Sequence, residues 1–172
     1  MKTKILSYLA IILSLAIWAN ADPAQAAEAG ITKTKTVEAS ADKVWSLLRQ
    51  MDDVDRYSSA IATVEWKGNH GIGGERTCYG PDGNGFYKEK IVAFSDATRS
   101  YGYLVTEGVP VVGMANQFRV VDLGYNRSMI IWTTKYEAFM ENPNMNEEQF
   151  LMFLHQTVDE MFLNVANASI QS

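Results

Sequence analysis

The residues of this chain that could carry out chemistry are a glutamate and several tyrosines. Glu89, Tyr101 and Tyr103 are the candidate catalytic residues, because a carboxylate or phenol beside a bound molecule can exchange a proton with it. Glu107 and Tyr136 could act in the same way. Polar groups of this kind are also expected where a cavity only binds, so they indicate a site without choosing between binding and proton transfer.

Arg76 and Glu89 are expected at neighbouring inward positions of two strands. Buried charges must be paired or solvated, so these two side chains can form an ion pair. The pair can be purely structural, or it can hold a ligand carboxylate or hydroxyl through water. Both interpretations remain open from the sequence.

The other reactive residues indicate neither a metal site nor a nucleophile, and no cofactor is implied. His70 lies in a glycine-rich turn and His155 beside an apolar helical stripe, without the closely spaced His, Asp and Glu residues of a metal site. Cys78 is the single cysteine, so an internal disulfide is impossible. Strand alternation places it on an apolar face, which predicts a buried, inert thiol.

The elements that must position these residues are predicted as a run of strands followed by a long helix. Alternating patterns and turn residues predict strands at 31–37, 61–66, 76–79, 86–94, 101–106, 116–121 and 128–136. Ser40 is expected to cap a first helix, and 51–57 a second short helix or turn. Asn146 is expected to cap a helix over 147–168.

The final helix carries one wide apolar stripe, which needs a large partner surface. The stripe consists of Phe150, Leu151, Leu154, Val158, Met161, Phe162 and Val165, with Phe153 at its border. The concave side of the sheet is the only candidate partner. The order of elements therefore predicts an α+β helix-grip fold, in which a curved antiparallel sheet of about seven strands wraps around the C-terminal helix. Two short helices follow the first strand.

Strand alternation also assigns side chains to the inner face of the sheet, because successive side chains point to opposite sides. The expected ligand-binding residues are Arg76, Tyr87, Glu89, Tyr101, Tyr103, Val105, Asn116, Phe118, Trp132, Thr134 and Tyr136 from the sheet, and Phe150, Leu154, Val158 and Phe162 from the helix. Ile91 and Ala93 are placed on the same face. A mostly apolar lining with few polar groups is typical of small-molecule sites, although the same aromatics could simply fill a core.

Several short motifs occur in an order that resembles a known superfamily. They are ASADKVW at 39–45, G-x-x-R-T at 73–77, D-G at 82–83, an E-x-I strand ending in Asp96, Y-x-Y-x-V at 101–105 and W-T-x-x-Y at 132–136. Together they resemble the SRPBCC superfamily, in its polyketide cyclase/dehydrase and lipid-transport branch. The resemblance extends over essentially the whole chain after the N-terminal segment.

This resemblance implies a deep cavity between sheet and long helix that accepts amphipathic or lipid-like ligands. It also implies a gate loop, here formed by Glu107, Gly108, Val109, Pro110 and Val111. It does not imply an enzyme, because the branch contains binders, transporters and cyclases. A non-catalytic binding or carrier protein is the first interpretation. The alternatives are a cyclase or dehydratase using a cavity Glu/Tyr acid–base pair, and a protein-interaction module whose gate loop contacts a partner.

The N-terminus has the features of a secretory signal peptide. Lys2 and Lys4 precede an apolar run at 5–18, and two A-x-A motifs follow at 19–21 and 24–26. The run is shorter than the roughly 20 residues of a membrane span. We expect cleavage after Ala26, although Ala21 also fits, which leaves 27–172 as one periplasmic or secreted domain without a stable membrane span.

Charge narrows the choice of partner. The formal net charge is -5, and no stretch of clustered Lys and Arg is present. Phosphate binding needs such clusters, so nucleic acid is not an expected partner. We expect a small hydrophobic or amphipathic ligand, and a monomer or weak dimer.

Overall fold

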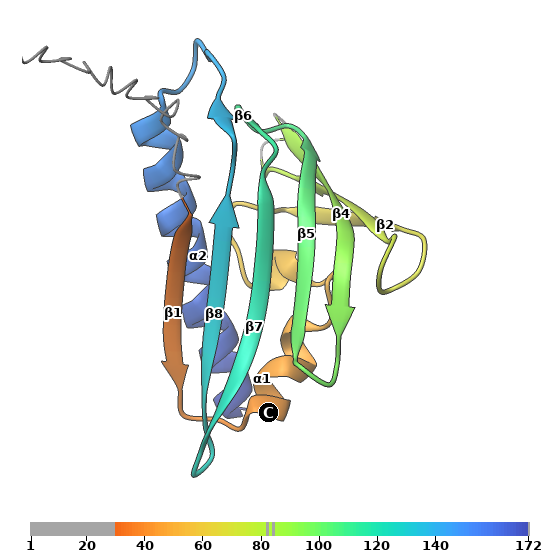
Figure 1. Ribbon diagram of the computed structural model, residues 1–172, viewed down its shortest axis with the longest axis vertical. Coiled ribbons are helices and arrows are strands. Elements are labelled where there is room, and N and C mark those ends of the chain that lie inside the picture. The colour runs from red at the N-terminus through yellow and green to blue at the C-terminus, as the bar shows by residue number, and fades with distance from the viewer. Residues whose placement is uncertain (1–29, 82, 84, 172) are drawn as a thin grey trace, which may run out of the picture.

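The computed structural model describes residues 30–81, 83 and 85–171, and shows a curved antiparallel sheet packed on one long helix (Figure 1). The main sheet has the strand order β1-β8-β7-β5-β4-β3-β2. Its strands are β1 (Ile31–Val37), β2 (Thr63–Lys67), β3 (Glu75–Tyr79), β4 (Phe86–Ser95), β5 (Ser100–Glu107), β7 (Ala115–Gly124) and β8 (Arg127–Lys135). The predicted signal peptide at 1–26 and the Asp82 of the D-G motif lie outside the described residues.

The helices confirm the α+β helix-grip prediction, with one difference in the second short helix. Helix α1 (Ala41–Leu48) follows β1, and the long helix α2 (Glu147–Gln171) runs behind the sheet in the view of Figure 1. Between them, η1 (Val54–Arg56) is a single 3-10 turn. This segment is rich in Asp, whose side chains favour turns and caps over helix interiors.

Both helices begin where their capping residues predict. The Ser40 hydroxyl accepts a hydrogen bond from the Lys43 backbone N–H at 3.3 Å. At the start of α2, Asn146 and Gln149 form a reciprocal pair in which each side-chain oxygen accepts the other's backbone N–H at 2.9 Å. These bonds satisfy N–H groups that have no partner inside the helix.

Helix α2 is fastened on both flanks at mid-length. On one side, Lys33 of β1 forms an ion pair with Asp159 at 2.6 Å. On the other side, the Ser59 hydroxyl donates to Glu160 at 3.0 Å, and Asn164 Nδ2 donates to the Tyr57 carbonyl at 3.0 Å. The loop after η1 and the edge strand therefore hold the helix in place over the sheet.

A β-bulge in β4 changes which side chains point inward. Ile91 lies inside, as predicted, and is fully buried, but the predicted inward position of Ala93 is wrong. The register with β5 shifts between Ile91 and Ala93, so alternation restarts and Ala93 is exposed. Phe94 takes the inward position instead, with its ring 5.7 Å from that of Trp45.

Asp96, just beyond β4, connects the sheet to α1. Its Oδ1 accepts the Trp45 indole N–H at 2.7 Å, and Arg49 donates to both carboxylate oxygens at 3.0 Å. Residues 39–45 and Asp96 belong to two separate sequence motifs, and the structure brings these motifs into contact.

A small second sheet lies beside the main one and was not predicted. Strands β6 (Val111–Val112) and β9 (Ala138–Phe139) pair antiparallel. They hold the far end of the predicted gate loop, because Val111 is buried within this pairing. The near end is held at Gly108, whose φ is +92° and where a Cβ would lie 2.0 Å from the Phe86 carbonyl oxygen.

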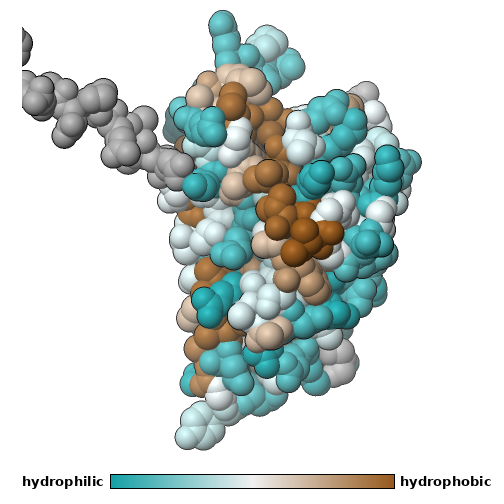
Figure 2. Space-filling model, turned by 45° about the vertical axis from the view of Figure 1, so that its right-hand side comes forward, coloured by the Kyte–Doolittle hydropathy of each residue, from teal (hydrophilic) through white to brown (hydrophobic). Residues whose placement is uncertain are grey.

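The outer face of the sheet carries some exposed apolar side chains. Val92 and Leu104 are 44% and 39% exposed. Figure 2 shows a strip of apolar surface among hydrophilic residues on this side of the molecule. Leu104 lies on the same strand as Val105 but points to the opposite face, so a substitution at Leu104 is a matched control for the same substitution at Val105.

Candidate functional site

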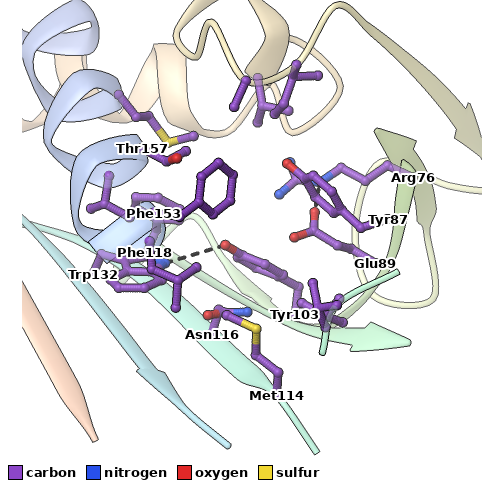
Figure 3. Close-up of a pocket in the computed structure, with 18 of the residues that line it drawn as sticks. Arg76, Tyr87, Glu89, Tyr103, Met114, Asn116, Phe118, Trp132, Phe153 and Thr157 are labelled. Carbon is purple, nitrogen blue, oxygen red and sulfur yellow. Dashed lines mark hydrogen bonds and ion pairs between the residues drawn. The ribbon is translucent and has the colours of Figure 1, made fainter. Parts of the chain in front are cut away.

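A small cavity lies between the concave face of the sheet and α2 (Figure 3). Its volume is about 90 Å³. Ligand pockets usually measure roughly 300–1,000 Å³, so the cavity is much smaller than the deep one that the resemblance implies. The rings of Tyr103, Phe118 and Trp132 occupy part of the space but do not close it.

Most of the predicted ligand-binding residues line this cavity. They are Arg76, Tyr87, Glu89, Tyr103, Val105, Asn116, Phe118, Trp132, Phe150, Leu154 and Val158. β3, β4, β5, β7 and β8 supply the sheet residues, and α2 supplies the rest. Of the predicted gate loop, Val109 also contacts the cavity.

Four predicted binding residues, Tyr101, Thr134, Tyr136 and Phe162, are buried but lie outside the lining. Tyr101 packs against Trp45 of α1, and the Tyr136 hydroxyl donates to Glu147 at 2.7 Å at the start of α2. Phe162 meets the Phe118 ring edge-on, further along α2. Tyr101, Tyr136 and Phe162 therefore lie where a helix packs directly on the sheet.

The structure adds lining residues that the predicted binding set lacks. They are Val54, Ala60, Ile61, Met114, Phe153, Thr157 and Met161. Val54 and Ala60 lie in or after the irregular η1 segment, where no periodicity assigns a face. Ile61 was predicted to begin the strand at 61–66, but β2 begins at Thr63, so Ile61 belongs to the segment before the strand. Phe153 borders the apolar stripe of the helix, and this position in the sequence could have indicated that it lines the cavity.

Phe153 stands at the mouth of the cavity. Its side chain is 43% exposed and yet lines the cavity. Figure 3 shows its ring between α2 and the side of the cavity formed by Tyr87 and Glu89. Rotation of this one side chain would therefore change both the access to the cavity and its size.

Arg76 and Glu89 form the predicted ion pair inside the cavity wall. Arg76 Nε donates to the Glu89 carboxylate, and Nη1 donates to the Met51 carbonyl. The guanidinium also lies 5.1 Å from the centre of the Tyr103 ring. No other charged side chain of the described residues lines the cavity, so the lining carries no net charge.

Burial governs the protonation of this pair. Burial raises the pKa of Glu89, and the nearby guanidinium offsets only part of that rise. For Arg76, burial acts to lower the pKa but is outweighed, chiefly by attraction to Glu89, so its pKa is raised and the side chain stays charged.

The buried phenols and the thiol are neutral at physiological pH. Burial raises the pKa of Tyr101 to about 12 and the pKa values of Tyr87 and Tyr103 well above their ordinary value. The Tyr103 hydroxyl accepts the Trp132 indole N–H at 3.4 Å. Cys78 is buried as predicted, and burial raises its pKa to about 12. Tyr87 and Tyr103, which line the cavity, can therefore hydrogen-bond a ligand but do not supply a base.

Asn116 is the one lining residue whose buried side-chain polar atoms lack partners within the described ranges. It is 5% exposed, and neither Oδ1 nor Nδ2 has a hydrogen-bond partner there. It lies opposite Tyr103 of β5 and Thr134 of β8 in the sheet register. The Thr134 hydroxyl also lacks a partner in the same part of the chain, but it does not reach the cavity.

The histidines lie away from this site. His70 Nε2 is 2.9 Å from the Asp52 carboxylate, and its ring stacks on Trp66. The His155 side chain is exposed on α2. Across the described ranges, no group of three or more His, Cys, Asp or Glu residues could hold a metal ion. No helix in the same ranges is long and apolar enough to cross a membrane.

A curved sheet gripping a long helix around an apolar cavity defines a helix-grip ligand-binding domain. The family described as polyketide cyclase / dehydrase and lipid transport matches residues 28–153, and the chain belongs to that family. The resemblance to the SRPBCC superfamily is thereby confirmed.

Solved structures share the fold at low sequence identity. An uncharacterised protein from Bacillus thuringiensis has a TM-score of 0.70 and 18% identity, covering 83% of this chain and 99% of its own. Norcoclaurine synthase from Thalictrum flavum, in complex with dopamine and hydroxybenzaldehyde, has a TM-score of 0.67 and 20% identity over 83% and 86%. Ara h 8.0201 has a TM-score of 0.68 and 16% identity over 83% and 98%. No curated protein matches the chain significantly in sequence.

Proposed function

We propose that this protein binds or carries a small hydrophobic or amphipathic molecule, without chemical change, in the cavity between the sheet and α2. The cavity itself is the observation that carries the proposal. Its lining is aromatic and aliphatic apart from a neutralised ion pair and a few uncharged polar groups. Family membership supports the same function, because the family includes lipid transport.

The size of the cavity limits the ligand. An apolar protein cavity of about 150 Å³ can hold benzene, whereas this space measures about 90 Å³. A ligand of one ring therefore occupies the open mouth as well as the cavity. A larger ligand requires Phe153 to swing outward. The N-terminal features described above add export to the proposal, with the ligand bound in the periplasm or outside the cell.

Ligand binding can be tested with toluene and a pair of matched variants. Val105→Trp fills the cavity from β5, whereas Leu104→Trp adds the same ring on the outer face of the same strand. We expect saturation-transfer NMR to detect toluene on the wild-type protein and on Leu104→Trp, but not on Val105→Trp. Failure of the wild-type protein to bind toluene, or equal binding by both variants, would overturn the proposal.

A second candidate function is proton transfer on the bound molecule, as in a cyclase or dehydratase. Glu89 favours it, because a buried carboxyl group with a raised pKa beside a cavity is suited to acid–base chemistry. The bond to Arg76 argues for a structural role of the same group. Loss of turnover of a poly-β-ketone substrate in Glu89→Gln, with toluene binding retained, would support catalysis, and unchanged turnover would remove Glu89 from the mechanism.

A further inference from the structure

We propose that Asn116 is the polar anchor of the cavity and that it selects an uncharged aromatic ligand with adjacent hydrogen-bond donor and acceptor groups, such as a carboxamide. This inference rests on the proposed ligand-binding function and specifies the chemical class of the ligand. It is carried by the unpaired amide of Asn116, the neutral charge of the lining and the aromatic walls.

The unpaired amide is the first observation. Asn116 lines the cavity, and both its donor and its acceptor atom lack partners within the described ranges. Leaving a buried amide without hydrogen bonds is unfavourable, so such groups are rare unless a ligand or water completes them. A carboxamide completes both atoms at once, because its carbonyl accepts from Nδ2 while its N–H donates to Oδ1.

The balance of charge disfavours an anionic ligand. Arg76 is already bonded to Glu89 and to the Met51 carbonyl, and the described lining residues include no second cation. A buried carboxylate would therefore have no counter-charge and would repel Glu89. It would also bring no N–H group for Asn116 Oδ1. A ligand that is neutral at physiological pH avoids all three penalties.

The walls favour a flat ring attached to that polar group. Tyr103, Phe118 and Trp132 lie on the sheet side, and Phe150 and Phe153 on the helix side. Aromatic rings gain from offset or edge-on contact with one another beyond simple burial of area. The volume of about 90 Å³ limits the ligand to about one ring, part of which extends into the open mouth.

Thr134 provides a matched control for Asn116. The two residues are paired in the β7–β8 register, both are buried, and both have side-chain polar atoms without partners in the described structure. Only Asn116 lines the cavity. Valine has nearly the same shape as threonine but no hydroxyl. Thr134→Val therefore removes an unpaired buried polar group at a position that a ligand in the cavity does not contact.

The experiment compares benzamide, benzoate and toluene by NMR titration at pH 7. The wild-type protein should bind benzamide at least about tenfold more tightly than benzoate. In Asn116→Leu, benzamide affinity should fall about tenfold while toluene affinity is retained. Thr134→Val should leave the ratio of benzamide to toluene affinity unchanged.

Thermal unfolding without ligand separates an anchor from a structural residue. Asn116→Leu should keep or raise the Tm, because it removes an unpaired amide, whereas loss of a structural asparagine would lower the Tm. Asn116→Ala is the second variant and should show the same loss of benzamide preference if leucine prevents folding.

The outcomes distinguish the inference from the function on which it rests. No toluene binding by the wild-type protein would overturn both. Toluene binding with an unchanged ratio of benzamide to toluene affinity in Asn116→Leu and Asn116→Ala would overturn the anchor alone. Tighter binding of benzoate than of benzamide would overturn the choice of a neutral ligand.

Discussion

At the scale of single residues, the cavity depends on two charges that neutralise each other out of water. The Arg76 and Glu89 side chains are only 3% and 5% exposed. Removing one partner from such a pair leaves a buried, uncompensated charge, whereas replacing both with apolar residues is often tolerated. The contribution of each residue to the stability of the protein therefore depends strongly on the presence of the other.

A double-mutant cycle would measure this dependence. Glu89→Leu and Arg76→Met should each lower the free energy of unfolding by about 3–5 kcal/mol. The double variant should recover most of that loss, because neither charge then remains. Urea unfolding measures all four proteins, and additive losses would contradict a coupled pair.

Phe153 offers a second test at this scale. Phe153→Ala should widen the mouth and strengthen binding of naphthalene, which is larger than the present cavity. The change should lower stability by only about 1 kcal/mol, since the side chain is half exposed. Met152→Ala is the control, because Met152 is exposed and does not line the cavity. Equal naphthalene affinity in both variants would show that Phe153 does not limit access.

Sequence patterns predicted individual positions only where alternation was unbroken. In β8, Trp132 and Thr134 were assigned inward and are buried. Ala93 was assigned wrongly because a bulge resets alternation and leaves no mark in the local sequence. Ala60 could not be assigned, because an irregular segment has no period from which a face follows. Ile61 was wrongly placed at the start of a strand, since β2 begins only at Thr63.

At the scale of elements, Asp96 joins α1 to the sheet. Its carboxylate receives bonds from Trp45 and Arg49, and hydrogen bonding by Arg49 first, then Trp45, lowers its pKa. The Asp96 side chain is 55% exposed, so solvent screens the interaction. The contact positions α1 but contributes modestly to stability.

Asp96→Asn should reveal this contribution through its pH dependence. A lowered pKa in the folded state means that the stabilisation is present above the ordinary value of 3.8 and is lost as the pH falls through the folded value. We expect Asp96→Asn to lower the free energy of unfolding by about 1 kcal/mol at neutral pH. The difference in free energy of unfolding between wild type and Asp96→Asn, measured in urea, should shrink below pH 3.8. A difference that stays constant with pH would contradict a role for the ionised Asp96 carboxylate.

Gly108 fixes the start of the predicted gate loop. Its φ is positive and the Phe86 carbonyl occupies the position of a Cβ, whereas Gly124 also has a positive φ but nothing within 4 Å. Gly124→Ala should therefore lower the free energy of unfolding by about 1 kcal/mol, through backbone strain alone. Gly108→Ala should lose more and should also weaken toluene binding, since Val109 lines the cavity. Equal Tm values for the two variants would contradict the close contact.

At the scale of the whole molecule, the architecture was predictable because long strands and a long amphipathic helix have strong periods. The two-residue strands β6 and β9 were not predictable, since two residues have no period. The narrowness of the cavity also could not be read from the sequence, because it depends on how far each ring reaches across the interior.

Export is the prediction that concerns the whole chain. Full-length protein expressed in a bacterial host should be recovered from the periplasm with a mass that begins at Ala27. Leu13→Arg places a charge in the apolar run and should leave uncleaved protein in the cytoplasm. An intact N-terminus on wild-type protein, measured by mass spectrometry, would contradict cleavage.

The fastening of α2 on both flanks also bears on how quickly a ligand can exchange. Lys33 and the loop carrying Ser59 hold the helix at Asp159 and Glu160. Whole-helix displacement is therefore the slower route, and rotation of the Phe153 ring is the faster one. Exposed side chains rotate within picoseconds to nanoseconds, so we expect residence times to be set by affinity and not by a slow opening of the protein.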